Sequence, residues 1–128
     1  MIRLTLLISL AGVILLPATP LIAQEAQPDS ALVRAATATL RSDLRNFLVA
    51  QETYYADHNT YAPSLHDMGE IYRPSPGVTV VLLTSSDTGH SEIAIDERVP
   101  GLVCALYVGN APPPLGRGSE GEVVCRGP

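Results

Sequence analysis

The two cysteines, Cys104 and Cys125, are the residues with the clearest chemistry. In a chain that leaves the cytoplasm, which the first residues of this one indicate, an even pair predicts a disulfide, because no reducing pool opposes it. The sequence has no C-x-x-C spacing and neither cysteine has a histidine nearby, so a metal site or a redox couple is a weaker alternative. A bridge would close a loop of about 20 residues and stabilise a small domain by roughly 3 kcal/mol.

Several side chains that can bind a metal lie together between residues 57 and 70. They are Asp57, His58, Asn59, His66, Asp67 and Glu70. The sequence has no His-x-x-x-His pair for zinc, and the stretch that begins at Asp57 lacks the glycine and the glutamate that complete a calcium loop. We therefore interpret these side chains as residues that end and cap helices. No metal or other cofactor is predicted.

No set of residues predicts an enzyme. The chain has serines and three histidines, but it has no Gly-x-Ser-x-Gly elbow and no activated cysteine. His90 directly follows a turn at residues 87–89, where exposed polar residues are usual. The glycines at residues 116–121 match a dinucleotide fingerprint in letters only, since they follow a run of prolines and no helix opens after them. We predict a protein without catalytic activity.

The first 23 residues predict a secretory signal peptide. Arg3 precedes a run of apolar or small residues from residue 4 to 16, and this run is shorter than the roughly 20 residues that a membrane-spanning helix needs. Pro17 and Pro20 follow, and cleavage is expected near Ala23. The alternative is an anchor helix retained over residues 2–23, which the two prolines disfavour. The expected location is the periplasm, the cell surface or the medium.

The remaining chain divides into a polar leader, residues 24–29, and one domain, residues 30–128. Lysine is absent, and removal of the signal leaves 7 arginines against 13 acidic residues, a net charge of 7 − 13 = −6. An acidic surface with scattered arginines gives no electrostatic footprint for nucleic acid or anionic lipid. We therefore expect neither as a primary partner, and contact with a membrane only through an uncleaved signal.

One uninterrupted helix is predicted from residue 31 to about 57. The stretch has no proline or glycine, Asp29 or Ser30 can cap its start, and Asn59 favours a left-handed stop. Steps of three and four residues place an apolar stripe along it, and the charged side chains, Asp43 included, lie mostly off that stripe. The predicted core residues of the helix and its end are Leu40, Leu44, Phe47, Leu48, Gln51, Tyr54, Tyr55 and Tyr61.

The polar members of this set have their own interpretations. Tyr54, Tyr55 and Tyr61 could form an aromatic binding surface, but such tyrosines more often anchor a helix end on a sheet, with the ring buried and the hydroxyl in water. We favour the anchoring role. Gln51 lies on the apolar stripe, where its side chain is expected to bond a backbone group of the following loop.

Four strands are predicted after the helix, at residues 78–84, 91–96, 102–108 and 121–125. A short turn at residues 65–68 and a hairpin loop at residues 85–89 separate the elements. In the second strand Glu92, Ala94 and Asp96 alternate with Ile93 and Ile95. A helix followed by a meander of strands predicts an α+β domain, with the helix packed on one face of a four-stranded antiparallel sheet.

The end of the helix resembles a known family. Residues 50–61 read Ala-Gln-Glu-Thr-Tyr-Tyr-Ala-Asp-His-Asn-Thr-Tyr, which is similar to the run that ends the long first helix of type IV pilins and pseudopilins. The resemblance covers roughly residues 40–125, and the late pair of cysteines is also pilin-like. It implies a headpiece domain in which a long helix packs on an antiparallel sheet.

The start of the chain departs from that family. It lacks the Gly-Phe-Thr-Leu-x-Glu cleavage box and the retained hydrophobic helix that holds pilin subunits in a filament core. We therefore expect an exported, non-enzymatic structural or interaction module, accessory to a cell-envelope or secretion assembly, with a protein partner of the cell envelope. The alternatives are a membrane-anchored minor pilin or pseudopilin subunit of a filament, and a periplasmic protein that binds a small ligand or a metal.

Overall fold

The computed structural model describes residues 29–128. The predicted signal peptide at residues 1–23, its cleavage near Ala23 and the polar leader as far as residue 28 lie outside the described residues. Within residues 29–128, no helix is both long enough and apolar enough to cross a membrane.

The first described element is helix α1, Ser30–His58. The Asp29 side chain caps its start by accepting a hydrogen bond from the Ala31 N–H, and Asn59 ends it in the left-handed conformation, with φ 55°. The Asn59 N–H donates to the Tyr55 carbonyl at 2.8 Å. The helix extends one residue beyond the predicted range at each end.

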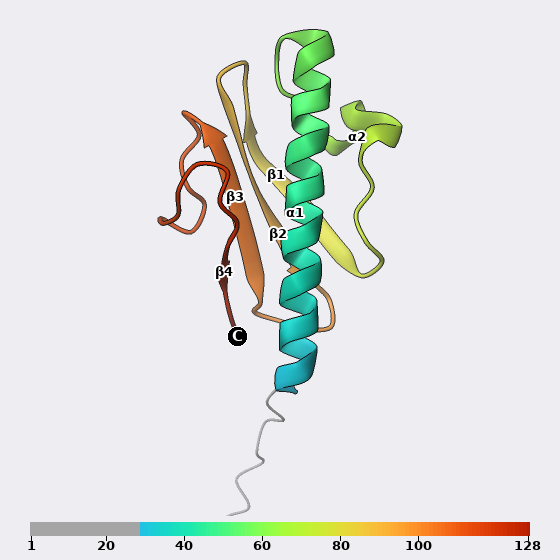
Figure 1. Cartoon of the computed structure of the whole chain (residues 1–128), viewed down its shortest axis with the longest axis vertical. Helices are drawn as coiled ribbons and strands as arrows, with labels where there is room; N and C mark the ends of the chain where they lie inside the picture. The colour runs from blue at the N-terminus through green and yellow to red at the C-terminus, as the bar shows by residue number, and fades with distance from the viewer. Residues whose placement is uncertain (1–28) are drawn as a thin grey trace, which may run out of the picture.

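Two short helical turns connect α1 to the sheet. Helix α2, Leu65–Met68, begins at Ser64, whose side chain caps its first turn, and the 3-10 helix η1, Gly69–Ile71, follows it. The chain then brings Tyr72 under α1, where its ring meets the edge of the Phe47 ring with centroids 5.0 Å apart. In the view of Figure 1, α2 lies on the opposite side of α1 from β3 and β4.

Four antiparallel strands form one sheet in the order β1-β2-β3-β4. They are β1, Val78–Ser85; β2, Gly89–Asp96; β3, Val103–Gly109; and β4, Val124–Arg126. Each strand pairs with the next one along the chain, and α1 crosses one face of the sheet (Figure 1). The predicted α+β fold, a helix packed on a four-stranded antiparallel sheet, is confirmed.

Two strand starts differ from the prediction by more than one residue. β2 begins two residues earlier, because Gly89 pairs with Gly109 and allows the two strands to approach closely; a Cβ on Gly89 would lie 2.5 Å from the Val108 carbonyl oxygen. β4 begins three residues later than predicted. Gly121 has φ 74°, a left-handed turn conformation that ends any extended run at this position.

The apolar core lies between α1 and the sheet. Of the residues predicted for it, Leu40, Leu44, Phe47 and Gln51 are fully buried. Leu48 and Tyr54 are half-buried against the core, and Tyr55 and Tyr61 are half-buried beside it. The difference follows from position, because Tyr54 and Tyr55 lie in the last turns of α1 and Tyr61 follows its end, where the hydroxyls can stay in water.

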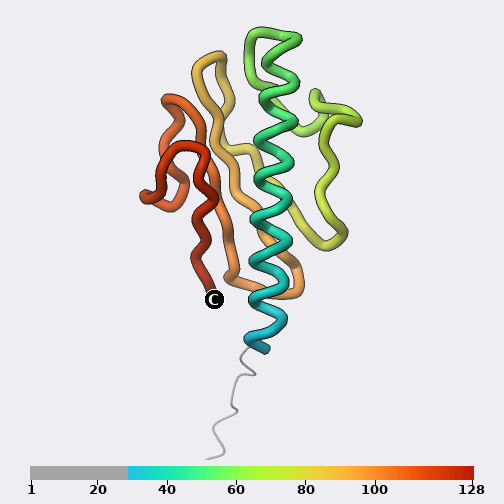
Figure 2. The backbone as a smooth tube through the Cα atoms, in the orientation of Figure 1, coloured from blue at the N-terminus to red at the C-terminus, as the bar shows by residue number. Residues whose placement is uncertain are grey.

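The disulfide is confirmed. Cys104 on β3 and Cys125 on β4 are direct partners in the strand register and are bonded, with their Cα atoms 4.0 Å apart. Figure 2 shows the segment between the two strands looping away from α1. A disulfide is typical of an oxidising compartment outside the cytoplasm.

Loss of the bridge should destabilise the domain. We expect Cys104→Ser to lower the free energy of unfolding by about 3 kcal/mol, because the unfolded chain regains the freedom of the closed loop and β4 has only a few residues to hold it. Urea unfolding followed by circular dichroism measures the loss. The wild-type protein unfolded with a reducing agent is the matched control and should behave like the variant. An unchanged unfolding midpoint would contradict a stabilising bridge.

Candidate functional site

The polarity of strand β2 is inverted relative to an ordinary half-buried strand. The side that faces α1 carries His90, Glu92 and Asp96, all of them buried, together with Ala94 in the core. The side that faces away from α1 carries the isoleucines, and Ile95 is 42% exposed. The sheet therefore hides acidic groups and leaves aliphatic groups in water, which is the reverse of what burial energies alone favour.

A buried pair, His90 and Glu92, lies beneath the end of α1. The His90 Nδ1 and a Glu92 carboxylate oxygen share a hydrogen bond of 2.8 Å, and both side chains are 0% exposed. The Phe47 ring packs against the imidazole with centroids 6.2 Å apart, and the Tyr61 ring covers it at 4.6 Å. The expectation that His90 is exposed after a turn is wrong, because the early start of β2 makes His90 an inward-facing strand residue.

Burial leaves polar atoms of this region without a partner. Among residues 29–128, the Tyr72 hydroxyl, the His90 Nε2 and the second Glu92 carboxylate oxygen have no hydrogen-bond partner. Burial raises the pKa of the Glu92 carboxyl, and the hydrogen bond from His90 opposes that rise. The pKa of Tyr72 is also raised, first by burial and then by the negative charges of Asp43 and Glu92.

This geometry does not make a catalytic site. A histidine paired with a carboxylate can act as a general base, but only on a substrate or nucleophile that reaches its free nitrogen. His90 and Glu92 are closed off from solvent, and the neighbouring Ser91 hydroxyl instead lies 3.1 Å from Thr84 on the other side of the sheet. The pair is therefore a buried structural hydrogen bond within the core.

Other buried polar side chains hold loops onto the fold. The Gln51 amide bonds both backbone groups of Ala62, donating to its carbonyl at 3.3 Å and accepting from its N–H at 2.8 Å, which is the contact expected for Gln51. Asp43 was predicted to lie off the buried stripe, and this is wrong. Its carboxylate is buried and accepts from the N–H and the hydroxyl of Ser75, because the chain that follows η1 lies along α1.

The acidic end of β2 has a charged partner. The Arg98 guanidinium donates to the Asp96 carboxylate through two nitrogens, at 2.9 and 2.6 Å. These hydrogen bonds hold the pKa of Asp96 below its usual range. The ionised carboxylate thereby closes the turn that leads from β2 to β3.

The tyrosines at the end of α1 are packed against neighbouring rings. Tyr54 stacks on His58 with centroids 3.8 Å apart, and Tyr55 lies 4.7 Å from Tyr61. The Tyr61 hydroxyl donates to Glu52 on α1. These contacts support the anchoring role over a free aromatic surface.

The metal-capable side chains between residues 57 and 70 are spread over separate local structures. Asn59 ends α1, Asp67 bonds the Ser64 hydroxyl in the cap of α2, and Glu70 pairs with Arg73. Within the described part of the chain, no three histidine, cysteine or acidic side chains come together in a way that could hold a metal ion.

The outer face of the sheet carries three of the five exposed large hydrophobic residues of the described structure. We use this name for Val81, Leu83, Ile93, Ile95 and Val103. The strand register places Val81 beside Ile93, and Ile95 beside Val103. Val81, Leu83 and Ile95 are 40%, 48% and 42% exposed. Monomeric proteins rarely leave such a patch uncovered without a use for it, so the outer face is the candidate functional site.

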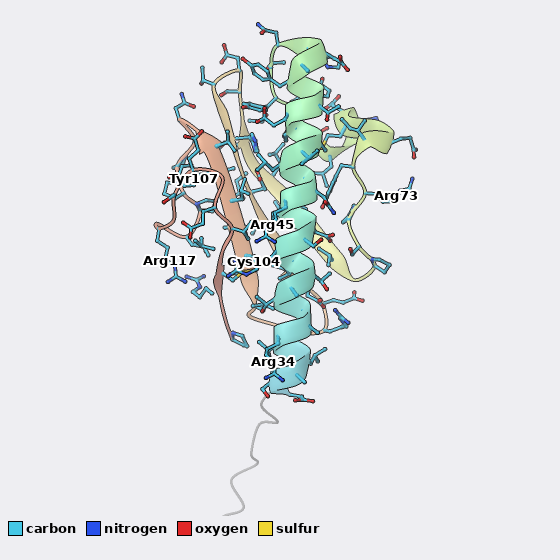
Figure 3. All side chains as sticks on the ribbon, viewed as in Figure 1. Arg34, Arg45, Arg73, Cys104, Tyr107 and Arg117 are labelled. Carbon is cyan, nitrogen blue, oxygen red and sulfur yellow. A yellow bond between two sulfur atoms is a disulfide. The ribbon has the colours of Figure 1, made fainter. Side chains whose placement is uncertain are left out.

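Two further exposed aliphatic residues, Val49 and Ile71, border a shallow cleft between α1 and η1. The polar neighbours Asn46, Thr53 and Arg73 line the same cleft and interrupt its apolar surface. The arginines labelled in Figure 3 lie on α1, after η1 and in the loop before β4, so they do not gather beside the outer face. The aliphatic character of the outer face is therefore its distinguishing property.

No protein family model matches the chain, and no curated protein is similar to it.

Proposed function

We propose that this protein is an exported, non-enzymatic interaction module with a pilin-like headpiece, which binds a protein of the cell envelope through the outer face of its sheet. The observation that carries the proposal is the inverted polarity of β2. Three of the five exposed large aliphatic residues of the described chain lie on the outer face, Val81 and Leu83 from β1 and Ile95 from β2, while Glu92 and Asp96 of β2 are buried. A face built this way loses water favourably only when a partner covers it.

Two further observations agree with this function. The disulfide between the last two strands suits a chain that works in an oxidising compartment. The run at residues 50–61 resembles the end of the first helix in type IV pilins and pseudopilins, and the chain has a helix on an antiparallel sheet at that point. The periplasm or the cell surface is the proposed place of action, and the partner is a component of an envelope or secretion assembly.

Site-specific crosslinking tests the proposal. A photo-crosslinking amino acid at Ile95 in the full chain, expressed in its native host, should form a discrete adduct with an envelope protein. The same amino acid at the exposed helix position Asp57 is the matched control and should give no such adduct. Ile95→Lys combined with a crosslinker at Val81 should abolish the adduct, because a charge then has to be buried in the contact.

The location is checked in the same cells. Mass spectrometry of the exported protein should find a mature chain that begins near Gln24 and contains an intact disulfide. A reduced chain in the cytoplasm, or equal crosslinking from Ile95 and Asp57, would overturn the proposed function. A retained helix at residues 2–23 would instead favour the membrane-anchored subunit.

A further inference from the structure

The two edges of the sheet are built very differently. β4 has three residues, one of which is tied by the disulfide, and Arg126 adds a charge. β1 has eight residues, VTVVLLTS, with no charged residue and no proline. Natural sheets usually protect an edge with charge, proline or short length, and β4 shows two of these devices. On β1 the sole device is a bulge next to Leu83.

The hydrogen-bond pattern shows which backbone groups of β1 are open. The Glu97 N–H donates to the Gly77 carbonyl at 3.1 Å, so these two residues form a hydrogen-bonded pair at the start of the ladder. Bonded and non-bonded pairs alternate in an antiparallel ladder, so Val78, Val80 and Leu82 point their N–H and C=O groups away from β2.

Only the first of these residues has a local partner. The Val78 N–H donates to the Ser75 carbonyl at 3.0 Å. In residues 29–128, no backbone hydrogen bond from outside the β1–β2 ladder reaches Val80 or Leu82. Residues 78–82 are thus an uncharged stretch with two free donors, the Val80 and Leu82 N–H groups, and three free acceptors, the C=O groups of Val78, Val80 and Leu82.

We propose that β1 pairs antiparallel with β1 of a second copy of this chain, about a two-fold axis near Val80. In that register Val78 lies opposite Leu82 of the second copy, and Val80 lies opposite Val80 of the second copy. Each free N–H then meets a free C=O across the joint. Thr79 lies opposite Val81 of the copy on the outer side. The joined sheet has eight strands, and its outer faces become continuous across the joint.

The neutrality of β1 is the reason for choosing a second copy as the occupant. The chain carries a net charge of −5, so two copies repel each other over most of their surfaces. Pairing through β1 places no like charges opposite one another, and it aligns β-branched and aliphatic side chains that stabilise cross-strand pairs. This inference goes beyond the proposed function, because it uses the edge of the sheet and leaves Ile95 free for the envelope partner.

Charge-swap variants test the register. Sedimentation of residues 24–128 between about 10 µM and about 1 mM should show the mass rising from that of a monomer to that of a dimer, as for a small, weak interface. Thr79→Lys with Val81→Lys should weaken the dimer by about tenfold or more, since the two lysines face each other across the axis. Thr79→Glu with Val81→Glu should do the same. An equimolar mixture of the two double variants should restore dimers.

Two further measurements make the outcome decisive. Ile95→Lys lies on the same outer face away from the edge, and it should leave the dimer intact. In the wild-type chain, hydrogen exchange at the Val80 and Leu82 amides should slow by about tenfold at high concentration, because these N–H groups become bonded. The Val81 amide, which is bonded to β2, should exchange at one rate throughout.

A chain that stays monomeric at about 1 mM overturns the inference. So does a dimer that Ile95→Lys abolishes while the Val80 and Leu82 amides keep exchanging quickly, since that dimer forms through the outer face. Recovery of dimers when the two double variants are mixed would uphold the edge pairing. If Ile95 and Asp57 crosslink equally in the same chain, the proposed function is rejected while the edge pairing stands. The two proposals therefore fail independently.

Discussion

Replacing Phe47 by alanine should lower the free energy of unfolding by about 3–5 kcal/mol. The ring is fully buried at the centre of the α1 stripe and meets both Tyr72 and His90 edge-on. Its removal deletes apolar contacts with the core and leaves a cavity beside polar atoms that already lack partners. Chemical denaturation followed by circular dichroism gives the difference directly.

Two variants of α1 calibrate this result. Phe47→Leu keeps most of the buried volume and should cost less than half as much as Phe47→Ala. Val49→Ala changes a side chain that is 64% exposed on the same helix, and its effect should stay within about 0.5 kcal/mol. Equal losses from Phe47→Ala and Val49→Ala would show that α1 is rotated relative to the orientation described here.

Removing His90 should have a comparable cost. We expect His90→Ala to destabilise the domain by about 3–5 kcal/mol near neutral pH, because the Glu92 carboxylate then stays buried without its hydrogen-bond donor. Glu92→Gln is the matched control: it removes the charge and keeps an acceptor for His90, so its cost should be much smaller. Similar losses from the two variants would mean that the buried charge is not the cause.

The cost of His90→Ala should also depend on pH. Burial raises the pKa of Glu92 in the folded state above its value in the unfolded chain, and loss of the His90 hydrogen bond raises it further. Protonation of Glu92 therefore favours the folded state; this contribution is complete below the ordinary carboxyl range and is lost as pH rises through the folded pKa. Urea unfolding at an acidic and at a mildly alkaline pH should show the larger penalty at alkaline pH. A penalty that does not change with pH would contradict this assignment.

Most of the backbone could be predicted from local signals in the sequence. The stretch without proline or glycine before Asn59 gives α1, and Ser64 marks the start of α2. The disulfide could be predicted because the chain has two cysteines, each with a single possible partner, and its first residues predict export. These features depend on residues close together in sequence or on simple counting, which is why they could be found without a structure.

Which side of β2 faces the core could not be predicted in the same way. Hydrophobicity alone places Ile93 and Ile95 in the core, and the alternation with Glu92 and Asp96 fits either orientation. The deciding information is the pairing of β2 with β1, in which Val80 faces inward and lies opposite Ala94. This register depends on a three-residue loop and on the close approach of Gly89 to β3. The same unknown register explains why the sequence predicts an exposed His90, whereas the residue is buried.

The disulfide between β3 and β4 also determines the outcome of a backbone cleavage between these strands. The connection between the strands is exposed over residues 116–122, so a protease can reach it more easily than the sheet. A single cut there would leave the last strand attached through sulfur, and the two pieces would migrate together until a thiol separates them. The same tie makes this connection a suitable place to insert a tag or a foreign epitope, since the final strand keeps its place whatever length of polypeptide is spliced in.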